Sequence, residues 1–165
     1  ALGLNSYEEY SLANRVVQKM LTLQNADGGF GEADSLTSTP DATGLALQAI
    51  NYRQTYGSDS EDKKRVAAEK NAVKYLLLTD VKNNHWDAFG GPSVNSTAYA
   101  VMGLKAAGRK ASALTTYTAW LKAQLSPKGG FMTSWSNGIG DVFATAQGYV
   151  PLLGLSYLNL IPVKK

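Results

Sequence analysis

The sequence predicts an all-α domain made of three helical hairpins. Two observations predict it: a ten-residue motif recurs three times along the chain, and a stretch with helical periodicity precedes each copy. The copies read DATGLALQAI (41–50), NSTAYAVMGL (95–104) and FATAQGYVPL (143–152). No segment alternates apolar and polar residues convincingly, so no β-strand is expected. The 165 residues suffice for one domain with a hydrophobic core.

Each copy of the motif has a threonine at its third position and a small residue directly after it. The threonines are Thr43, Thr97 and Thr145. Small residues on one face let a helix approach its neighbours closely, so we expect close helix contacts along these copies. The threonine hydroxyls are expected to bond to nearby backbone carbonyls or to groups of a neighbouring repeat.

Amphipathic helical patterns lie before the motifs. Between positions 12 and 23, apolar residues follow one another at spacings of three and four, which places them on one face of a helix. Thr39 before Pro40 is a capping residue followed by proline at the first helical position. The expected helices span about 7–25, 40–56, 60–79, 94–107, 111–125 and 141–158, and they pair into repeats of about 7–56, 60–107 and 111–158 within one domain, 1–165.

A glycine-rich turn separates the two helices of each expected hairpin. It reads DGGF (27–30) in the first repeat and KGGF (128–131) in the third, whereas HWDAFGG (85–91) is a degenerate version in the second. We expect the glycines to supply positive backbone angles for a tight turn. The aromatic residue is expected to fill the gap between the helices.

A metal site in the first turn is the alternative. Asp27, Glu32 and Asp34 could offer carboxylates to calcium, but their spacing departs from the helix–loop–helix calcium pattern. The third repeat has Lys128 where the first has Asp27, and a dedicated metal loop would keep its carboxylate. A structural turn is therefore preferred, and no metal ligand is assigned.

Composition argues against several classes of function. The absence of cysteine excludes disulfides, thiol catalysis and thiolate metal sites. The single histidine, His85, lies in a polar turn and is expected to be solvated. The net charge of +3 comes from lysines and arginines spread along the chain, which does not favour a nucleic-acid partner. No apolar run is long enough for a membrane span.

Three segments resemble a known family. WLKAQLSPKGGF, ATAQGYVPLLGL and LTLQNADGGFGEADSLTSTPDATGLALQAI are similar to the α/α-toroid repeats of terpenoid cyclases and protein prenyltransferases. The resemblance is greatest to the version found in bacterial secreted or cell-surface proteins, and more distantly to cobalamin carriers of the transcobalamin and intrinsic factor type. It covers nearly the whole chain. It implies secretion or display at the cell surface, while a cytoplasmic location stays open.

That family usually has six helix pairs in an inner and an outer ring, so three pairs imply a half or partial toroid. The resemblance further implies that helices 40–56, 94–107 and 141–158 are the inner ones, with their N-terminal ends at one mouth of the cavity. It implies that self-association or a missing N-terminal half completes the ring.

The motifs for the family's catalysis are not present. The sequence has neither the Asp-x-Asp-Asp acid motif, nor a metal-binding acidic cluster, nor the reactive Cys-Gly-Glu-Gln, and zinc ligation through cysteine is impossible. No catalytic residue is assigned. We therefore expect a non-catalytic binding or structural module. A terpenoid cyclase-like or prenyltransferase-like enzyme, or a fragment of one, is the alternative.

The candidate ligand-binding residues lie in the turns or early in the expected inner helices. They are Phe30, Trp86, Tyr99, Phe131, Trp135, Gln147 and Tyr149. Aromatic rings with a few polar groups suit a small hydrophobic or carbohydrate ligand or a protein partner. The alternative is that these aromatics fill the core. No cofactor is expected, apart from the cobalamin-type ligand that the resemblance alone implies.

Overall fold

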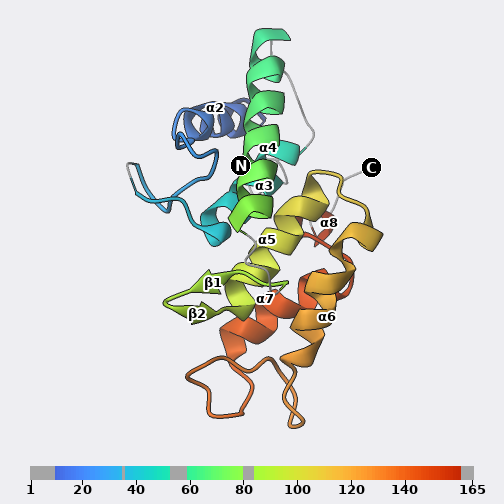
Figure 1. Ribbon diagram of the computed structural model, residues 1–165. Helices are drawn as coiled ribbons and strands as arrows, with labels where there is room; N and C mark the ends of the chain where they lie inside the picture. Colours follow the sequence, from blue (N-terminus) through green and yellow to red (C-terminus); the bar gives the residue numbers. More distant parts are fainter. Residues whose placement is uncertain (1–9, 35, 53–58, 80–83, 161–165) are drawn as a thin grey trace.

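The computed structural model describes residues 10–34, 36–52, 59–79 and 84–160. These residues are predominantly helical, which confirms the expected all-α class (Figure 1). The elements are α2 (Tyr10–Leu21), α3 (Pro40–Asn51), α4 (Asp59–Thr79), β1 (Asp87–Ala88), β2 (Gly91–Pro92), α5 (Val94–Ala106), the 3-10 helix η1 (Ala111–Leu114), α6 (Thr115–Ala123), α7 (Val142–Leu152) and α8 (Tyr157–Leu160). None of the helices in the described ranges is long and apolar enough to cross a membrane.

Some expected helix limits differ from those observed. Helix α2 ends at Leu21 rather than at 25, and positions 7–9 lie outside the described residues. Helix α3 ends at Asn51, and positions 53–56 are again outside the described ranges. The expected helix 111–125 begins as a 3-10 turn and ends at Ala123.

The expected single helix 141–158 is wrong, because the chain divides it into α7 and α8. Gly154, at φ +67°, takes the left-handed conformation that ends a helix. Its amide donates to the Pro151 carbonyl at 3.0 Å, and the Leu155 amide donates to the Val150 carbonyl at 3.2 Å. These two hydrogen bonds form a Schellman motif, which satisfies the last carbonyls of α7 and turns the chain away.

The expectation of no strand is wrong for four residues. Strands β1 and β2 pair antiparallel, Asp87 with Pro92 and Ala88 with Gly91. Phe89 and Gly90 connect them at φ +54° and +86°. Two successive positive φ angles are typical of a type I′ turn, whose twist matches that of a hairpin. The phenylalanine is therefore held at the tip of the hairpin.

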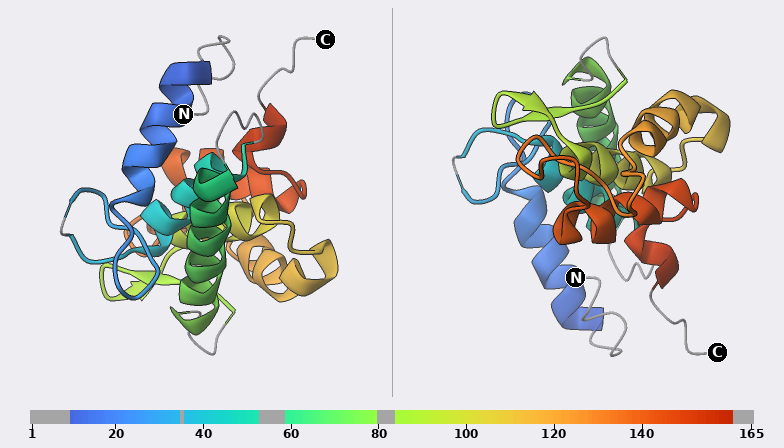
Figure 2. Two further views of the ribbon diagram at one scale, coloured as in Figure 1. Left: turned by 90° about the horizontal axis from the view of Figure 1, so that it is seen from above. Right: turned by 90° about the horizontal axis from the view of Figure 1, so that it is seen from below.

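Helices α3, α5 and α7 pack side by side in chain order, as a central row. Helix α4 packs on α3, and α6 packs on α5 and α7, while α2 contacts α3 and α4. Figure 2 shows α2 and α6 on opposite sides of the molecule, with α4 between them. Each helix of the row is thus preceded in the chain by a helix that lies outside the row.

Glycines bring α3 and α5 into backbone contact, as the small-residue pattern predicts. A Cβ atom added at Gly44 would lie 2.2 Å from the carbonyl oxygen of Tyr99. One added at Gly103 would lie 2.7 Å from the Cα of Gly44. Both distances are shorter than atoms can approach, so neither position has room for a side chain.

The three recurring threonines play the same part in each repeat. Every one accepts a hydrogen bond from the backbone amide of the aromatic residue in the turn before it. The pairs are Phe30 with Thr43 at 2.9 Å, Trp86 with Thr97 at 3.0 Å and Phe131 with Thr145 at 2.9 Å. The expected bonds to carbonyls or to another repeat were therefore wrong in the main. Within the described ranges, Thr43 alone of the three also donates back to its own turn, to the Phe30 carbonyl at 3.4 Å.

The helix caps repeat in the same register. The side chains of Thr39, Ser93 and Asp141 accept from backbone amides in the first turns of α3, α5 and α7. The amide of each cap residue donates in turn to the carbonyl of the same aromatic. Aromatic, cap and threonine thus form one hydrogen-bonded unit, which fixes the start of each central helix against its turn.

Candidate functional site

The N-terminal turns of α3, α5 and α7 open on one cavity of about 320 Å³, here called the N-terminal groove. All three helices of the central row, the β1–β2 hairpin and the loop before α7 contribute to it. Its walls are Asp41, Phe89, Ser93, Asn95, Ser96, Tyr99, Trp135, Asp141, Phe143 and Gln147. The repeat explains this convergence, because equivalent positions on three adjacent helices face the same side.

Equivalent positions supply most of the groove. Asp41, Asn95 and Phe143 are the first residues of the three motif copies. Tyr99 and Gln147 are the fifth residues of the second and third copies. The cap at the start of each helix fixes how the helix is rotated about its axis. The first and fifth residues of the motif therefore face the groove.

The floor of the groove is polar and hydrogen-bonded. The Asn95 side-chain amide on α5 donates to the Gln147 side-chain oxygen on α7. Gln147 also hydrogen-bonds to the phenol of Tyr99, and the Tyr99 ring packs edge-on against Tyr157 at 6.3 Å. This network joins α5 to α7, and both amide residues line the groove.

Burial alters the acidity of two of the lining groups. Desolvation raises the pKa of the Asp41 carboxyl, and a hydrogen bond from Ser96 opposes this by lowering it. Desolvation, with Tyr157 nearby, raises the pKa of Tyr99 to about 12. The lining residues include no lysine or arginine. An anionic ligand would therefore find no counter-charge in the groove.

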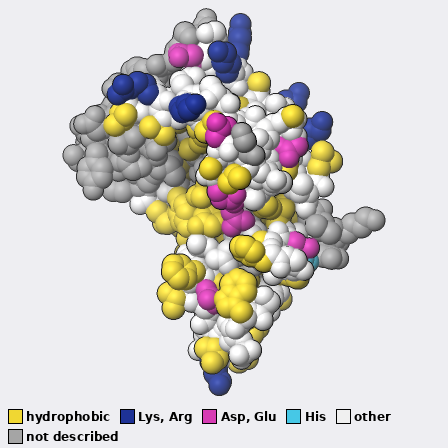
Figure 3. All heavy atoms as spheres, turned by 90° about the vertical axis from the view of Figure 1, so that its left-hand side faces the viewer, with side chains coloured by type: hydrophobic (Ala, Val, Ile, Leu, Met, Phe, Trp, Pro, Cys, Tyr) yellow, Lys and Arg dark blue, Asp and Glu magenta, His cyan; other side chains and the backbone are white. Residues whose placement is uncertain are grey.

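Exposed aromatic rings form the rim. Phe89 is 99% exposed at the hairpin tip, Phe143 is 75% exposed and Trp135 is 59% exposed. The indole nitrogen of Trp135 donates to the Asp141 carboxylate at 3.4 Å. Figure 3 looks toward the hairpin tip: hydrophobic and acidic side chains gather on this face, and most Lys and Arg side chains lie at one end of it.

Two larger cavities adjoin the groove through shared residues. One, of about 800 Å³, lies between the turn before α3 and the β1–β2 hairpin and shares Asp41 and Phe89 with the groove. Tyr75 lines it and donates to the Ser38 carbonyl at 2.8 Å; burial, with Asp27 and Glu32 nearby, raises its pKa to about 12. The other, of about 460 Å³, lies along α3 and also includes Asp41.

The structure brings three of the seven predicted site residues together in the groove: Tyr99, Trp135 and Gln147. The other four lie elsewhere. Phe30, Trp86 and Phe131 are core residues, exposed by 3%, 0% and 0%, as the core alternative for the aromatics predicted. Tyr149 packs edge-on against the Phe131 ring at 5.4 Å and is exposed on another face of α7.

Sequence reasoning missed Asp41, Asn95, Phe89 and Phe143. Three of them could have been found, because Asp41, Asn95 and Phe143 begin the three motif copies directly after Pro40, Val94 and Val142. Phe89 could not, since only the unexpected hairpin brings it to the groove. Asp27 and Glu32, the calcium alternative, instead accept hydrogen bonds from Ser38 and Thr39. In the described part of the chain, no cluster of three potential metal ligands occurs.

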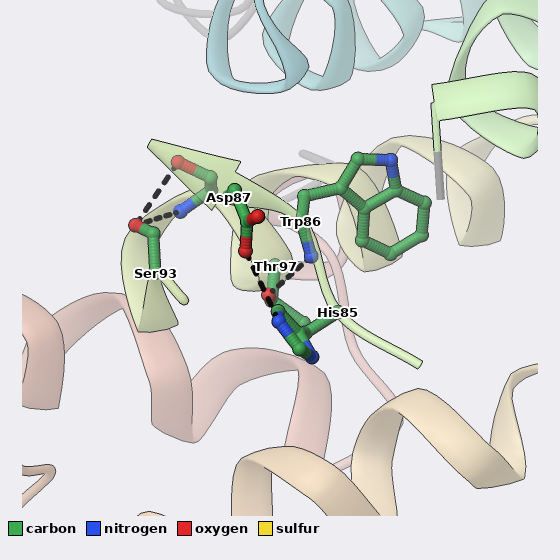
Figure 4. Close-up of polar contacts among 6 residues, drawn as sticks. His85, Trp86, Asp87, Ser93 and Thr97 are labelled. Atoms are coloured by element: carbon green, nitrogen blue, oxygen red, sulfur yellow. Dashed lines mark hydrogen bonds and ion pairs between the residues drawn. The ribbon is translucent and has the colours of Figure 1, made fainter. Parts of the chain in front are cut away.

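His85 is buried, so the expectation of a solvated side chain is wrong. Its ring stacks on Trp120 of α6, with centroids 4.6 Å apart, and its Nε2 lies 3.1 Å from an Asp87 carboxylate oxygen. Figure 4 shows His85 and Asp87 facing each other beside the bond from the Trp86 amide to Thr97. The histidine ties the β1–β2 hairpin to α6, away from the groove lining.

Neither the models of known protein families nor the sequences of curated proteins match this chain.

Proposed function

We propose that the chain is a non-catalytic binding module that takes a small, neutral, polyhydroxylated ligand of the carbohydrate class in the N-terminal groove. One observation carries the proposal: the first turns of three repeats place side-chain carboxyl, amide and phenol groups beneath a rim of exposed aromatic rings. Ligand sites combine apolar surface with a few polar groups that set orientation.

The floor of the groove favours hydroxyl groups over charged groups. Asn95 and Gln147 each carry a donor and an acceptor, so they can pair with a ligand hydroxyl in either sense. Burial raises the pKa of the Asp41 carboxyl and so disfavours its charged form. The lining holds the carboxyl groups of Asp41 and Asp141 and no lysine or arginine. A phosphate or carboxylate ligand is therefore disfavoured.

The rim favours a ligand with a flat apolar face. Trp135 and Phe143 expose rings that a sugar ring or a similar flat body would cover. Large exposed aromatic side chains are uncommon on surfaces without a partner, and three of them surround one cavity here.

Tryptophan fluorescence tests the proposal. Trp86 is fully buried and Trp120 packs against the core, so Trp135 is the exposed indole whose emission should shift on ligand uptake. We expect neutral di- and trisaccharides to shift the emission saturably, and a sugar phosphate of the same size to do so far more weakly. Saturable binding of none of the neutral sugars would contradict the carbohydrate class.

Paired variants locate the site. Trp135→Ala should weaken sugar binding at least tenfold, measured by calorimetry because the reporter is removed. Ile139→Ala is the matched control: this residue has the same exposure, 59%, in the same loop, and does not line the groove. Equal losses in both variants would place binding outside the groove.

An acid-catalysing enzyme of the terpenoid cyclase type is the second candidate, and Asp41 is the observation that favours it. A carboxyl with a raised pKa in a cavity can act as a general acid. The purified chain would then convert a neutral polyene such as squalene, and Asp41→Asn would abolish turnover while binding persists. Binding of sugars without any turnover of squalene would favour the binding module.

The resemblance to toroid repeats also supports a bacterial secreted or cell-surface setting as part of this proposal. Fractionation of the native host with an antibody to the chain tests it. The same resemblance implies a corrin ligand, but no group in the groove favours one over a sugar.

A further inference from the structure

One face of α7 is apolar, uncharged and exposed. Residues at spacings of four and three form it, and it is here called the α7 face. They are Val142, Ala146, Tyr149 and Leu153, of which Val142 is 79%, Tyr149 44% and Leu153 69% exposed. No charged residue occurs between Val142 and Leu152. A solvated helix face normally carries charges, so this one is built like a buried face.

The internal repeat shows what covers the same face elsewhere. When Thr97 is aligned with Thr145, the α7 face corresponds to Val94, Ala98, Val101 and Lys105 of α5. The first three are exposed by 4%, 0% and 2%, and Lys105 is half-buried. Val94 packs in one cluster with residues of the third repeat, among them Phe131 and Ala144. Residues of the next repeat, among them Ala144 of its central helix, therefore cover part of this face of α5.

A reciprocal face lies open on α3, at the other end of the row. It consists of Ala42, Leu45 and Ala49, here called the α3 face, and it lines the cavity of about 460 Å³. Leu45 is 40% exposed, and the two alanines are half-buried. The equivalent residues of α5 and α7 pack against the preceding repeat. Among them, Ser96 and Ala144 are buried.

We infer that the α7 face of one molecule docks on the α3 face of a second copy of this chain, head to tail. The contact continues the row of α3, α5 and α7 from one copy into the next. A second copy is the occupant because the α7 face and the α3 face correspond, through the repeat, to two surfaces that already pack against each other inside the molecule. The residues of the two faces are uncharged, and Glu32 and Asp41 line the same cavity as the α3 face.

The internal interface also predicts the register of this contact. Gly44 of α3 touches the backbone of Tyr99 on α5. Gly44 aligns with Ala146, and Tyr99 aligns with Leu45. Ala146 of one copy should therefore meet Leu45 of the other. Such an interface joins two different patches, so it differs from a symmetric contact in which the same patch meets itself.

Native mass spectrometry and sedimentation velocity over a dilution series test the inference. The wild-type chain should form dimers or higher assemblies that dissociate on dilution. Ala146→Glu and Leu45→Lys should each be monomeric, because each places a charge in one of the two faces. Val66→Glu is the matched control, since Val66 lies on α4 outside both faces and is 65% exposed; this variant should associate like the wild type.

Mixing the two monomeric variants distinguishes head-to-tail contact from other modes. The Ala146→Glu chain keeps an intact α3 face, and the Leu45→Lys chain keeps an intact α7 face. An equimolar mixture should therefore form a heterodimer through the two intact faces. A monomeric wild-type chain at every concentration, or variants that stay monomeric when mixed, would overturn the inference. Circular dichroism melts check that each variant is folded.

Discussion

A substitution at Thr97 tests the hydrogen bond between each repeated threonine and the aromatic residue of the turn before it. Replacement by valine keeps the shape of the side chain and removes only the hydroxyl that accepts from the Trp86 amide at 3.0 Å. Both residues are 0% exposed, so water cannot replace the lost partner. The Trp86 amide would remain buried and unsatisfied.

The expected loss follows from two opposing contributions. A buried donor left without an acceptor costs about 1–3 kcal/mol. The added methyl group returns up to about 0.8 kcal/mol through burial. We therefore expect Thr97→Val to lower the free energy of unfolding by about 1–2 kcal/mol. For a chain of this size that corresponds to a melting temperature lower by roughly 2–8 °C.

Urea unfolding followed by circular dichroism measures the loss. Thr116→Val is the control, because Thr116 is exposed on α6 and its replacement should change stability by less than about 0.5 kcal/mol. Thr145→Val should fall between the two, since its bond is only partly buried. If Thr97→Val and Thr116→Val had the same effect, the repeated hydrogen bond would not hold the turn.

Two further predictions concern the helix contact and the buried tyrosine. Gly44→Ala forces a Cβ to within 2.2 Å of the Tyr99 carbonyl oxygen, so we expect a loss of about 1–3 kcal/mol in urea unfolding. Gly91→Ala is the control, because Gly91 has open space around it and no positive φ, and this variant should lose less than about 0.5 kcal/mol. Equal losses would refute direct backbone contact of α3 and α5. Tyr75 has a folded-state pKa of about 12 against an ordinary value of 10.0. Its contribution to the free energy of unfolding is therefore fully present below about pH 10 and is lost as pH rises to about 12. Tyr75→Phe removes the bond to Ser38, and its stability difference from the wild type should shrink across that window; a constant difference would contradict the assignment.

Local signals in the sequence predicted the starts of the central helices well. Thr39 before Pro40 caps α3 as expected, because a cap needs only the residues that follow it. Asp141 caps α7 in the same way. The end of α7 was missed although its signal was present. Gly154 follows Leu152 and Leu153 and could have been read as a helix stop.

Features that depend on distant residues could not be predicted in this way. His85 reads as a solvated turn residue, but Trp120, on a different helix, covers its ring. The hairpin tip at Phe89 needs a positive φ that phenylalanine rarely adopts. The turn sequence therefore has the glycine of the usual two-residue signal but not the asparagine or aspartate before it. The register of the repeat alone predicts that Asp41, Asn95 and Gln147 line the groove. Phe89 lines it because of the tertiary structure.

Amide chemical shifts measured during a titration with a neutral oligosaccharide test the central claim most directly. We propose that the first turns of three repeats form one binding groove. Saturable shift changes should therefore appear together at Asp41, Asn95 and Gln147, on three different helices, with equal apparent affinity. Changes confined to one helix, or to the far ends of α3, α5 and α7, would contradict it.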